Sequence, residues 1–183
     1  MICYLIRHGQ DDDTLRGGWS SAPLTEAGTA QAQRLAEHLA STHPEIDRLY
    51  SSDLLRARQT AEYISEKLML PITFLPQFRE VNNGLLAGMK NEDAAVLYPG
   101  LFWNTLEWDE CYPGGESPHL FFQRITEGWK EFIQLNRDCH GSIALVTHSG
   151  VINVILHLLE NKPYSNRNKP FPIAPAEYIS IEI

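Results

Sequence analysis

The chain has 183 residues, of which 43% are hydrophobic and 21% charged, and its formal net charge is −8. This length suits a single domain, and the composition excludes the disordered and fibrous classes. The negative charge argues against a protein that binds nucleic acid or a membrane surface, because such proteins present a basic face.

Short runs rich in β-branched and aromatic residues predict strands, and longer runs with apolar residues at helical spacing predict helices. The predicted strands are 2–6, 48–52, 71–75, 142–147 and 178–183. The predicted helices are 24–42, 53–70, 117–135 and 149–160. Thr25 is the expected N-cap of the first helix. The alternation predicts an α/β fold of three layers, a mainly parallel sheet with helices on both faces.

Residues 81–116 interrupt this alternation. Turn-forming pairs such as Asn83-Gly84 and Pro99-Gly100 separate short aromatic-rich pieces, which predicts a small cap-like excursion over the sheet. Its aromatic residues could form a wall for a substrate, or could pack the excursion against the rest of the protein, which is the commoner arrangement. They are Tyr98, Phe102, Trp103, Trp108 and Tyr112.

Cationic or potentially cationic groups follow three of the predicted strands. Arg7 and His8 follow the first strand and His148 follows the fourth, while Arg56 lies in the first turn of the helix after the second strand. The carboxyl ends of parallel strands meet at one edge of a sheet, where helix N-termini also direct their N–H groups. Because guanidinium groups match phosphate oxygens, the sequence predicts a phosphate pocket there.

Histidine can be the nucleophile in such a pocket if its attacking nitrogen is unprotonated. The neighbouring cations disfavour an added proton on His8, and Arg7, Arg56 and His148 could neutralise the phosphoryl oxygens. Glu80 is the expected proton donor to the leaving group and the later base toward water. Three further carboxyl groups remain alternatives for this role: Glu92, Glu107 and Glu110.

Six motifs occur in a characteristic order: "RHG", "PLTEAG", "SSDLLRARQTA", "FRE…GLLAG", "PGGES" and "VTHSG". In this order the chain resembles the phosphoglycerate-mutase-like branch of the histidine phosphatase superfamily, and in particular its small phosphatases. The resemblance implies one domain over residues 1–183, with 81–116 as its cap. It also implies a phosphohistidine on His8, a phosphate pocket completed by Arg7, Arg56 and His148, an acid/base at Glu80, and neither a cofactor nor a metal.

The loop after the first motif departs from the family's usual pattern. Residues 10–19 are shortened, and Thr14 stands near the place of an asparagine that is common in this branch. We expect Thr14 and Ser149 to bind substrate together with the four pocket residues. For the triplet Asp11-Asp12-Asp13 we favour a solvated loop over a metal site.

The leading hypothesis is a phosphomonoesterase that acts on a small phosphorylated metabolite. One alternative is a phosphoglycerate mutase, which returns the phosphoryl group to the substrate, and another is a catalytically silent module that binds phosphate. Within the excursion Lys90 is the one cation among six acidic residues, which favours monophosphates over bisphosphates and hydrolysis over mutase activity.

Two further expectations follow from the sequence. The cysteines, Cys3, Cys111 and Cys139, are odd in number and lack CxxC spacing, so we expect reduced thiols. The first residues, "MICYLIRHG", lack the features of a secretory signal, and the longest apolar runs are too short to cross a bilayer, so we expect a cytoplasmic protein without nucleic-acid or membrane partners.

Overall fold

A computed structural model describes residues 1–183 and contains one five-stranded sheet. Its strands are β1 (Ile2–Arg7), β2 (Ile46–Ser51), β3 (Ile72–Phe74), β4 (Ser142–Thr147) and β5 (Tyr178–Glu182), in the spatial order β3-β2-β4-β1-β5. The pairs β3-β2, β2-β4 and β4-β1 are parallel, whereas β5 pairs antiparallel with β1 at the edge. The predicted mainly parallel sheet is therefore confirmed.

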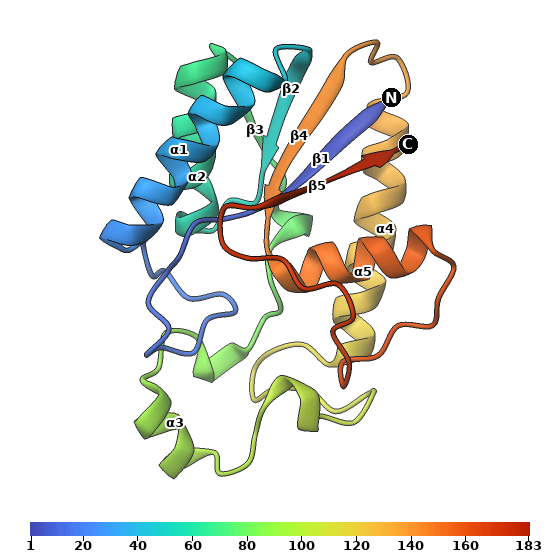
Figure 1. Cartoon of the computed structure of the whole chain (residues 1–183). Coiled ribbons are helices and arrows are strands. Elements are labelled where there is room, and N and C mark those ends of the chain that lie inside the picture. Colours follow the sequence, from blue (N-terminus) through green and yellow to red (C-terminus); the bar gives the residue numbers. More distant parts are fainter.

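The chain has five α-helices, which are α1 (Glu26–Thr42), α2 (Leu55–Leu68), α3 (Asn91–Leu97), α4 (Pro118–Leu135) and α5 (Ser149–Leu159). Of these, α1, α2, α4 and α5 cover the sheet and α3 lies below it (Figure 1). The Thr25 hydroxyl accepts a hydrogen bond from Gly28 N at 3.0 Å, which confirms the expected N-cap of α1. None of these helices combines the length and the apolar character needed to cross a membrane.

Alternate residues of the strands enter two different cores. Tyr4 and Ile6 pack with α1 and α2 on one face of the sheet, whereas Cys3 and Leu5 pack with α4 and α5 on the other. Successive side chains of a strand point to opposite faces, so a strand buried on both faces requires an almost continuous apolar run. The predicted three layers are confirmed, and the helix pairs α1–α2 and α4–α5 lie on either side of the sheet in Figure 1.

The excursion lies beyond the carboxyl ends of the parallel strands, at the bottom of Figure 1. It contains α3 and two short 3₁₀ turns, and Leu86, Leu106 and Tyr112 form a small core of its own. The Trp103 ring packs edge-on against Phe121 of α4 with centroids 5.4 Å apart. Aromatic packing thus attaches the excursion to the body of the protein.

The three cysteines form no disulfide bond with one another. All three are free; Cys3 and Cys139 are buried, whereas Cys111 is exposed. Burial raises the pKa of the Cys3 thiol well above its ordinary value, which keeps that group protonated.

Candidate active site

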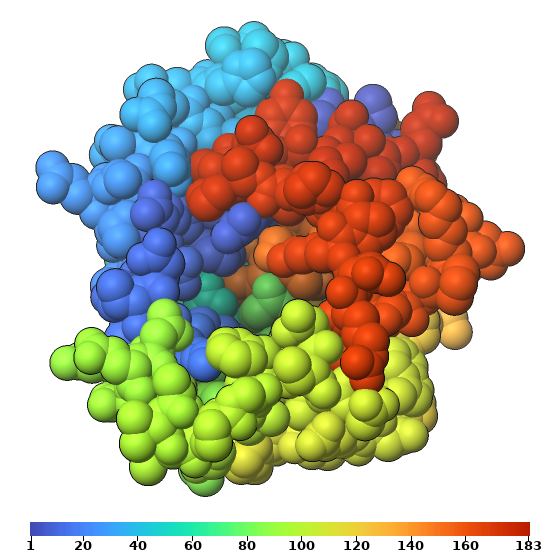
Figure 2. Space-filling view, turned by 60° about the horizontal axis from the view of Figure 1, so that its bottom comes forward, coloured from blue at the N-terminus to red at the C-terminus, as the bar shows by residue number.

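The residues expected to bind phosphate lie at the carboxyl end of the sheet. Figure 2 looks toward this end and shows a hollow bounded by the N-terminal loop in blue, the excursion in yellow-green and the segment before β5 in orange-red. Because β1 and β2 flank β4 on either side, residues that follow these three strands are neighbours in space. The predicted convergence follows from this strand order.

His8 follows β1 and is 5% exposed. Its Nδ1 lies 2.6 Å from the carbonyl oxygen of Gly9, and the Nε–H of Arg56 donates to His8 Nε2 at 3.2 Å. Burial lowers the pKa of His8 well below its ordinary value, and the charges of Arg56 and Arg7 lower it further. His8 is therefore neutral, and with Nδ1–H donating to the carbonyl, its Nε2 carries the lone pair.

Arg56 is almost fully buried and is wrapped by the loop that follows His8. One terminal nitrogen donates to Gly18 O at 2.7 Å, and the other lies 3.3 Å from Ser20 O. Arg7 donates to Ile173 O at 2.8 Å, while its Nε is buried without an acceptor. These contacts hold both guanidinium groups in place without the help of a ligand.

His148 follows β4 and is fully buried. Its ring lies 5.0 Å from that of His8 between centroids, and its Nε2 is 2.9 Å from the hydroxyl oxygen of Ser52. Burial, Arg56 and His8 lower the pKa of His148 well below its ordinary value. Its Nδ1 is buried without a hydrogen-bond partner. Since buried polar atoms are rarely left unpaired, the unpartnered Nδ1 here and Nε of Arg7 indicate a place where a ligand binds.

Glu80 lies beside the start of α5. One carboxylate oxygen accepts from Gly150 N at 3.0 Å and the other from Val81 N at 3.2 Å. Its backbone carbonyl accepts from the Trp19 indole N–H at 2.7 Å and from Arg124 at 3.1 Å, so both its main chain and its side chain are held.

The three alternative carboxyl groups occupy exposed positions in the excursion. Glu92 is exposed in α3, Glu107 pairs with Arg167, and Glu110 accepts from the backbone N–H of Glu107. Glu80 alone among the four lies against the first turn of α5. Its catalytic role remains a prediction.

The two additional predicted substrate-binding residues differ in position. Ser149 is the first residue of α5 and is buried, and its hydroxyl oxygen accepts from Lys169 Nζ at 2.7 Å. Thr14 is exposed, and its hydroxyl donates to Asp12 at 2.6 Å within an outer turn. Thr14 thus makes no hydrogen bond to the other predicted residues, and its role in substrate binding stays a prediction.

The position of the Asp11 side chain differs from the sequence prediction. Asp12 and Asp13 are exposed, as expected of a solvated loop, but the Asp11 side chain is 20% exposed and one of its oxygens lies 3.3 Å from Arg56 Nε. No cluster of three or more His, Cys, Asp or Glu side chains suited to a metal ion includes this triplet. The expectation of a solvated loop is wrong for Asp11, whose backbone bridges to Leu24 and whose side chain lies against the buried guanidinium.

A cavity of about 440 Å³, here called the Glu80 cavity, continues from Glu80 to the segment before β5. Its lining residues are Glu80, Val81, Trp103, Asn104, Gly150, Asn153, Tyr164, Ser165, Asn166, Arg167, Asn168 and Lys169. Two cations, Arg167 and Lys169, reach it from a segment that the sequence interpretation had not considered. Counting charges within residues 81–116 alone therefore understated the positive charge near the site.

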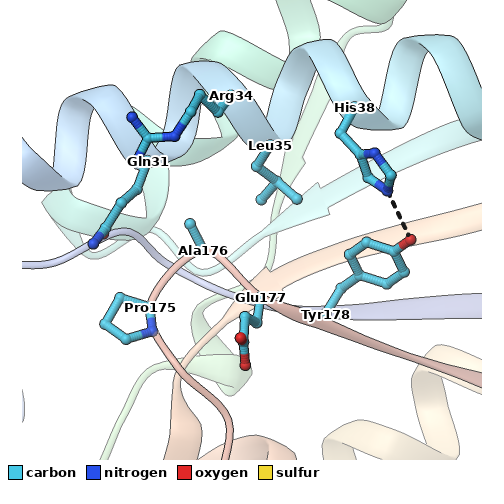
Figure 3. Close-up of a pocket in the computed structure, with 8 residues that line it drawn as sticks. All are labelled: Gln31, Arg34, Leu35, His38, Pro175, Ala176, Glu177 and Tyr178. Carbon is cyan, nitrogen blue, oxygen red and sulfur yellow. Dashed lines mark hydrogen bonds between the residues drawn. The ribbon is translucent and has the colours of Figure 1, made fainter.

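A second hollow, of about 490 Å³, lies elsewhere, between α1 and the segment that leads into β5 (Figure 3). It is lined by Gln31, Arg34, Leu35, His38, Pro175, Ala176, Glu177 and Tyr178. His38 Nε2 lies 3.2 Å from the Tyr178 hydroxyl across it. None of the predicted site residues lines this hollow.

Residues 3–183 match the family model described as the histidine phosphatase superfamily, branch 1. The chain belongs to this superfamily. It is 32% identical over 170 residues to a probable phosphatase of Schizosaccharomyces pombe, covering 90% of this chain and 77% of that protein. It is 29% identical to the adenosylcobalamin/alpha-ribazole phosphatase of Salmonella typhimurium, covering 89% and 81% of the two chains.

Solved structures agree with this assignment. A mycobacterial glucosyl-3-phosphoglycerate phosphatase superposes with a TM-score of 0.82 at 25% identity, covering 99% of this chain and 89% of that one. The expected phosphoglycerate-mutase-like fold is thereby confirmed. This histidine phosphatase is an enzyme that hydrolyses phosphate esters.

Proposed function

We propose that this histidine phosphatase hydrolyses a small phosphorylated metabolite through a phosphohistidine intermediate on His8. The observation that carries the proposal is a neutral His8 with the His148 ring 5.0 Å away, where His148 Nδ1 and the Nε of the adjacent Arg7 are buried without partners. A neutral nucleophile accompanied by polar nitrogens without partners suits a substrate that brings several acceptor oxygens. A phosphoryl group has this character.

In the first step, His8 Nε2 attacks phosphorus and the bond to the ester oxygen breaks. Arg7, Arg56 and His148 hold the phosphoryl oxygens as their charge is redistributed. The protonated Glu80 carboxyl donates its proton to the departing alcohol, which leaves through the adjoining Glu80 cavity.

In the second step, water attacks the phosphorus of the phosphohistidine. The Glu80 carboxylate takes one proton from this water, the phosphorus–nitrogen bond breaks, and inorganic phosphate and neutral His8 are released. The hollow in Figure 2 is open to solvent, so water can replace the alcohol once the alcohol has left. This access supports hydrolysis as the fate of the intermediate.

Hydrolysis of p-nitrophenyl phosphate in the presence of EDTA tests the proposed activity. We expect turnover by the wild-type protein, and a loss of roughly 10³-fold or more in His8→Ala, because this variant lacks the proposed nucleophile. His140→Ala is the matched control, since His140 is exposed and precedes the amino end of β4, whereas the site lies at the carboxyl end of that strand. Equal activity of His8→Ala and the control would refute the proposal.

One observation favours the mutase alternative. Arg167 and Lys169 line the Glu80 cavity, and a second phosphate group would need cations of this kind. Incubation with 3-phosphoglycerate and 2,3-bisphosphoglycerate, following both 2-phosphoglycerate and free phosphate, separates the two activities. We expect free phosphate to dominate; isomerisation faster than phosphate release would establish the mutase instead.

A further inference from the structure

Asp11 is held in place by tight backbone packing. Gly9 and Gly28 bring the loop after His8 against the start of α1 so closely that a Cβ on Gly28 would lie 2.0 Å from Gln10 O. The backbone of Asp11 also forms an antiparallel bridge with Leu24. The Asp11 side chain therefore extends from a fixed point of the main chain, unlike its exposed neighbours.

Arg56 has one nitrogen that is not used by backbone carbonyls. Its two terminal nitrogens contact the oxygens of Gly18 and Ser20, which leaves Nε. The single hydrogen of Nε is directed to His8 Nε2 at 3.2 Å, and the Asp11 carboxylate lies 3.3 Å from the same nitrogen. Asp11 thus occupies the edge of Arg56 that adjoins the nucleophile.

A phosphoryl group bonded to His8 Nε2 would need this same edge of Arg56. Its oxygens would then lie close to an Asp11 carboxylate, and like charges at short range repel. The charged groups that face Asp11 are Arg56 from α2, Arg7 from the end of β1, and Glu80. Burial raises the pKa of Asp11, the two arginines oppose that rise, and Glu80 adds to it.

We propose that Asp11 competes with the phosphoryl group for Arg56, so that phosphate binds together with a proton taken up from solvent by the Asp11 carboxylate. This inference rests on the proposed function, since it assumes that phosphate occupies the pocket around His8. A protonated Asp11 no longer repels the ligand and can donate a hydrogen bond to one of its oxygens. The arrangement weakens binding of the product phosphate as the pH rises, which favours its release.

Inorganic phosphate, used as a competitive inhibitor of p-nitrophenyl phosphate hydrolysis, tests this coupling. The inhibition constants of the wild-type protein, Asp11→Asn and Asp13→Asn are compared between about pH 5 and about pH 8. Phosphate ionises to the same extent in every measurement at a given pH, so its ionisation does not affect the ratio of the wild-type to the variant inhibition constant. We expect Asp11→Asn to bind phosphate about 10-fold more tightly than wild type at the alkaline end, with the ratio decreasing toward the acidic end.

Asp13→Asn is the matched control, because it removes the same charge from an exposed position of the same loop. It should behave like the wild type. A ratio for Asp11→Asn that stays near one at every pH, or an equal effect of Asp13→Asn, would overturn the inference while leaving the phosphatase activity intact. If no variant binds phosphate or hydrolyses the ester, the proposed function fails as well.

Calorimetry provides a second measurement that does not depend on the stability of Asp11→Asn. Phosphate is titrated into the wild-type protein and Asp13→Asn at the alkaline end, in buffers that differ in ionisation enthalpy. We expect both proteins to take up protons on binding. Binding without proton uptake would contradict the coupling.

Discussion

His8 and His148 are kept neutral at a cost to the stability of the folded protein. Both are buried, and burial together with Arg56 lowers their pKa values well below the ordinary value. In the unfolded chain both regain an ordinary pKa and take up protons as the pH falls below it. The contribution of these two histidines therefore leaves the folded protein most stable above the unfolded-state pKa, near 6.5. The free energy of unfolding decreases as the pH falls through that value.

Urea unfolding at about pH 7 and about pH 5.5 tests this. We expect the free energy of unfolding to decrease by about 2 kcal/mol between these values, with roughly half of the decrease removed in His148→Gln, because each histidine contributes one proton. If the free energy of unfolding of His148→Gln decreased as much as that of the wild type, His148 would not be neutral in the folded protein.

Glu80 should matter most when the leaving group is a poor one. In Glu80→Gln we expect hydrolysis of glycerol phosphate to fall by something like 10²- to 10⁴-fold, whereas p-nitrophenyl phosphate, whose leaving group needs less protonation, should be affected less. Glu107→Gln is the control, since Glu107 is exposed in the excursion. Equal losses on both esters would show that Glu80 is not the acid.

The helices and strands illustrate what local patterns can and cannot predict. The buried strands β1 and β4 were evident as apolar runs, and the cap of α1 at Thr25 from residue type. The antiparallel direction of β5 was not predictable, because a strand pattern carries no direction and the preceding segment has no periodic signal. The positions of Asp11 and Lys169 could not be predicted either, because both residues lie in irregular segments that are positioned by tertiary contacts.

The contact between the His8 loop and α1 depends on glycine at the helix start. Gly28→Ala would place a methyl group against Gln10 O, so the loop must move away from α1. We expect a loss of at least about 1–3 kcal/mol in the free energy of unfolding, together with a lower kcat/KM because His8 and Asp11 shift. Gly17→Ala, where nothing lies within 4 Å of the added carbon, is the control. Thermal unfolding and kinetics of both variants check this; equal effects would contradict it.

Across the whole molecule, a net charge of −8 coexists with a local concentration of positive charge. The strand order brings Arg7, Arg56 and the start of α5 to one edge, while most acidic side chains lie on the exterior. This convergence could be predicted, because the carboxyl ends of parallel strands share an edge. The shape of the Glu80 cavity could not be predicted, because the cavity lies between the excursion and a segment some sixty residues further along the chain. The hydrogen bond from Asn166 to the Trp103 carbonyl is one contact between these two segments.

The phosphohistidine on His8 is tested most directly by locating the phosphoryl group during turnover. A radiolabelled phosphate ester is mixed with the enzyme, the reaction is stopped in alkali, which preserves phosphohistidine, and the labelled peptide is identified. We expect label on the peptide containing His8, rapid loss of that label when unlabelled ester is added, and none in His8→Ala. Label on another residue, or equal labelling of His8→Ala, would contradict it.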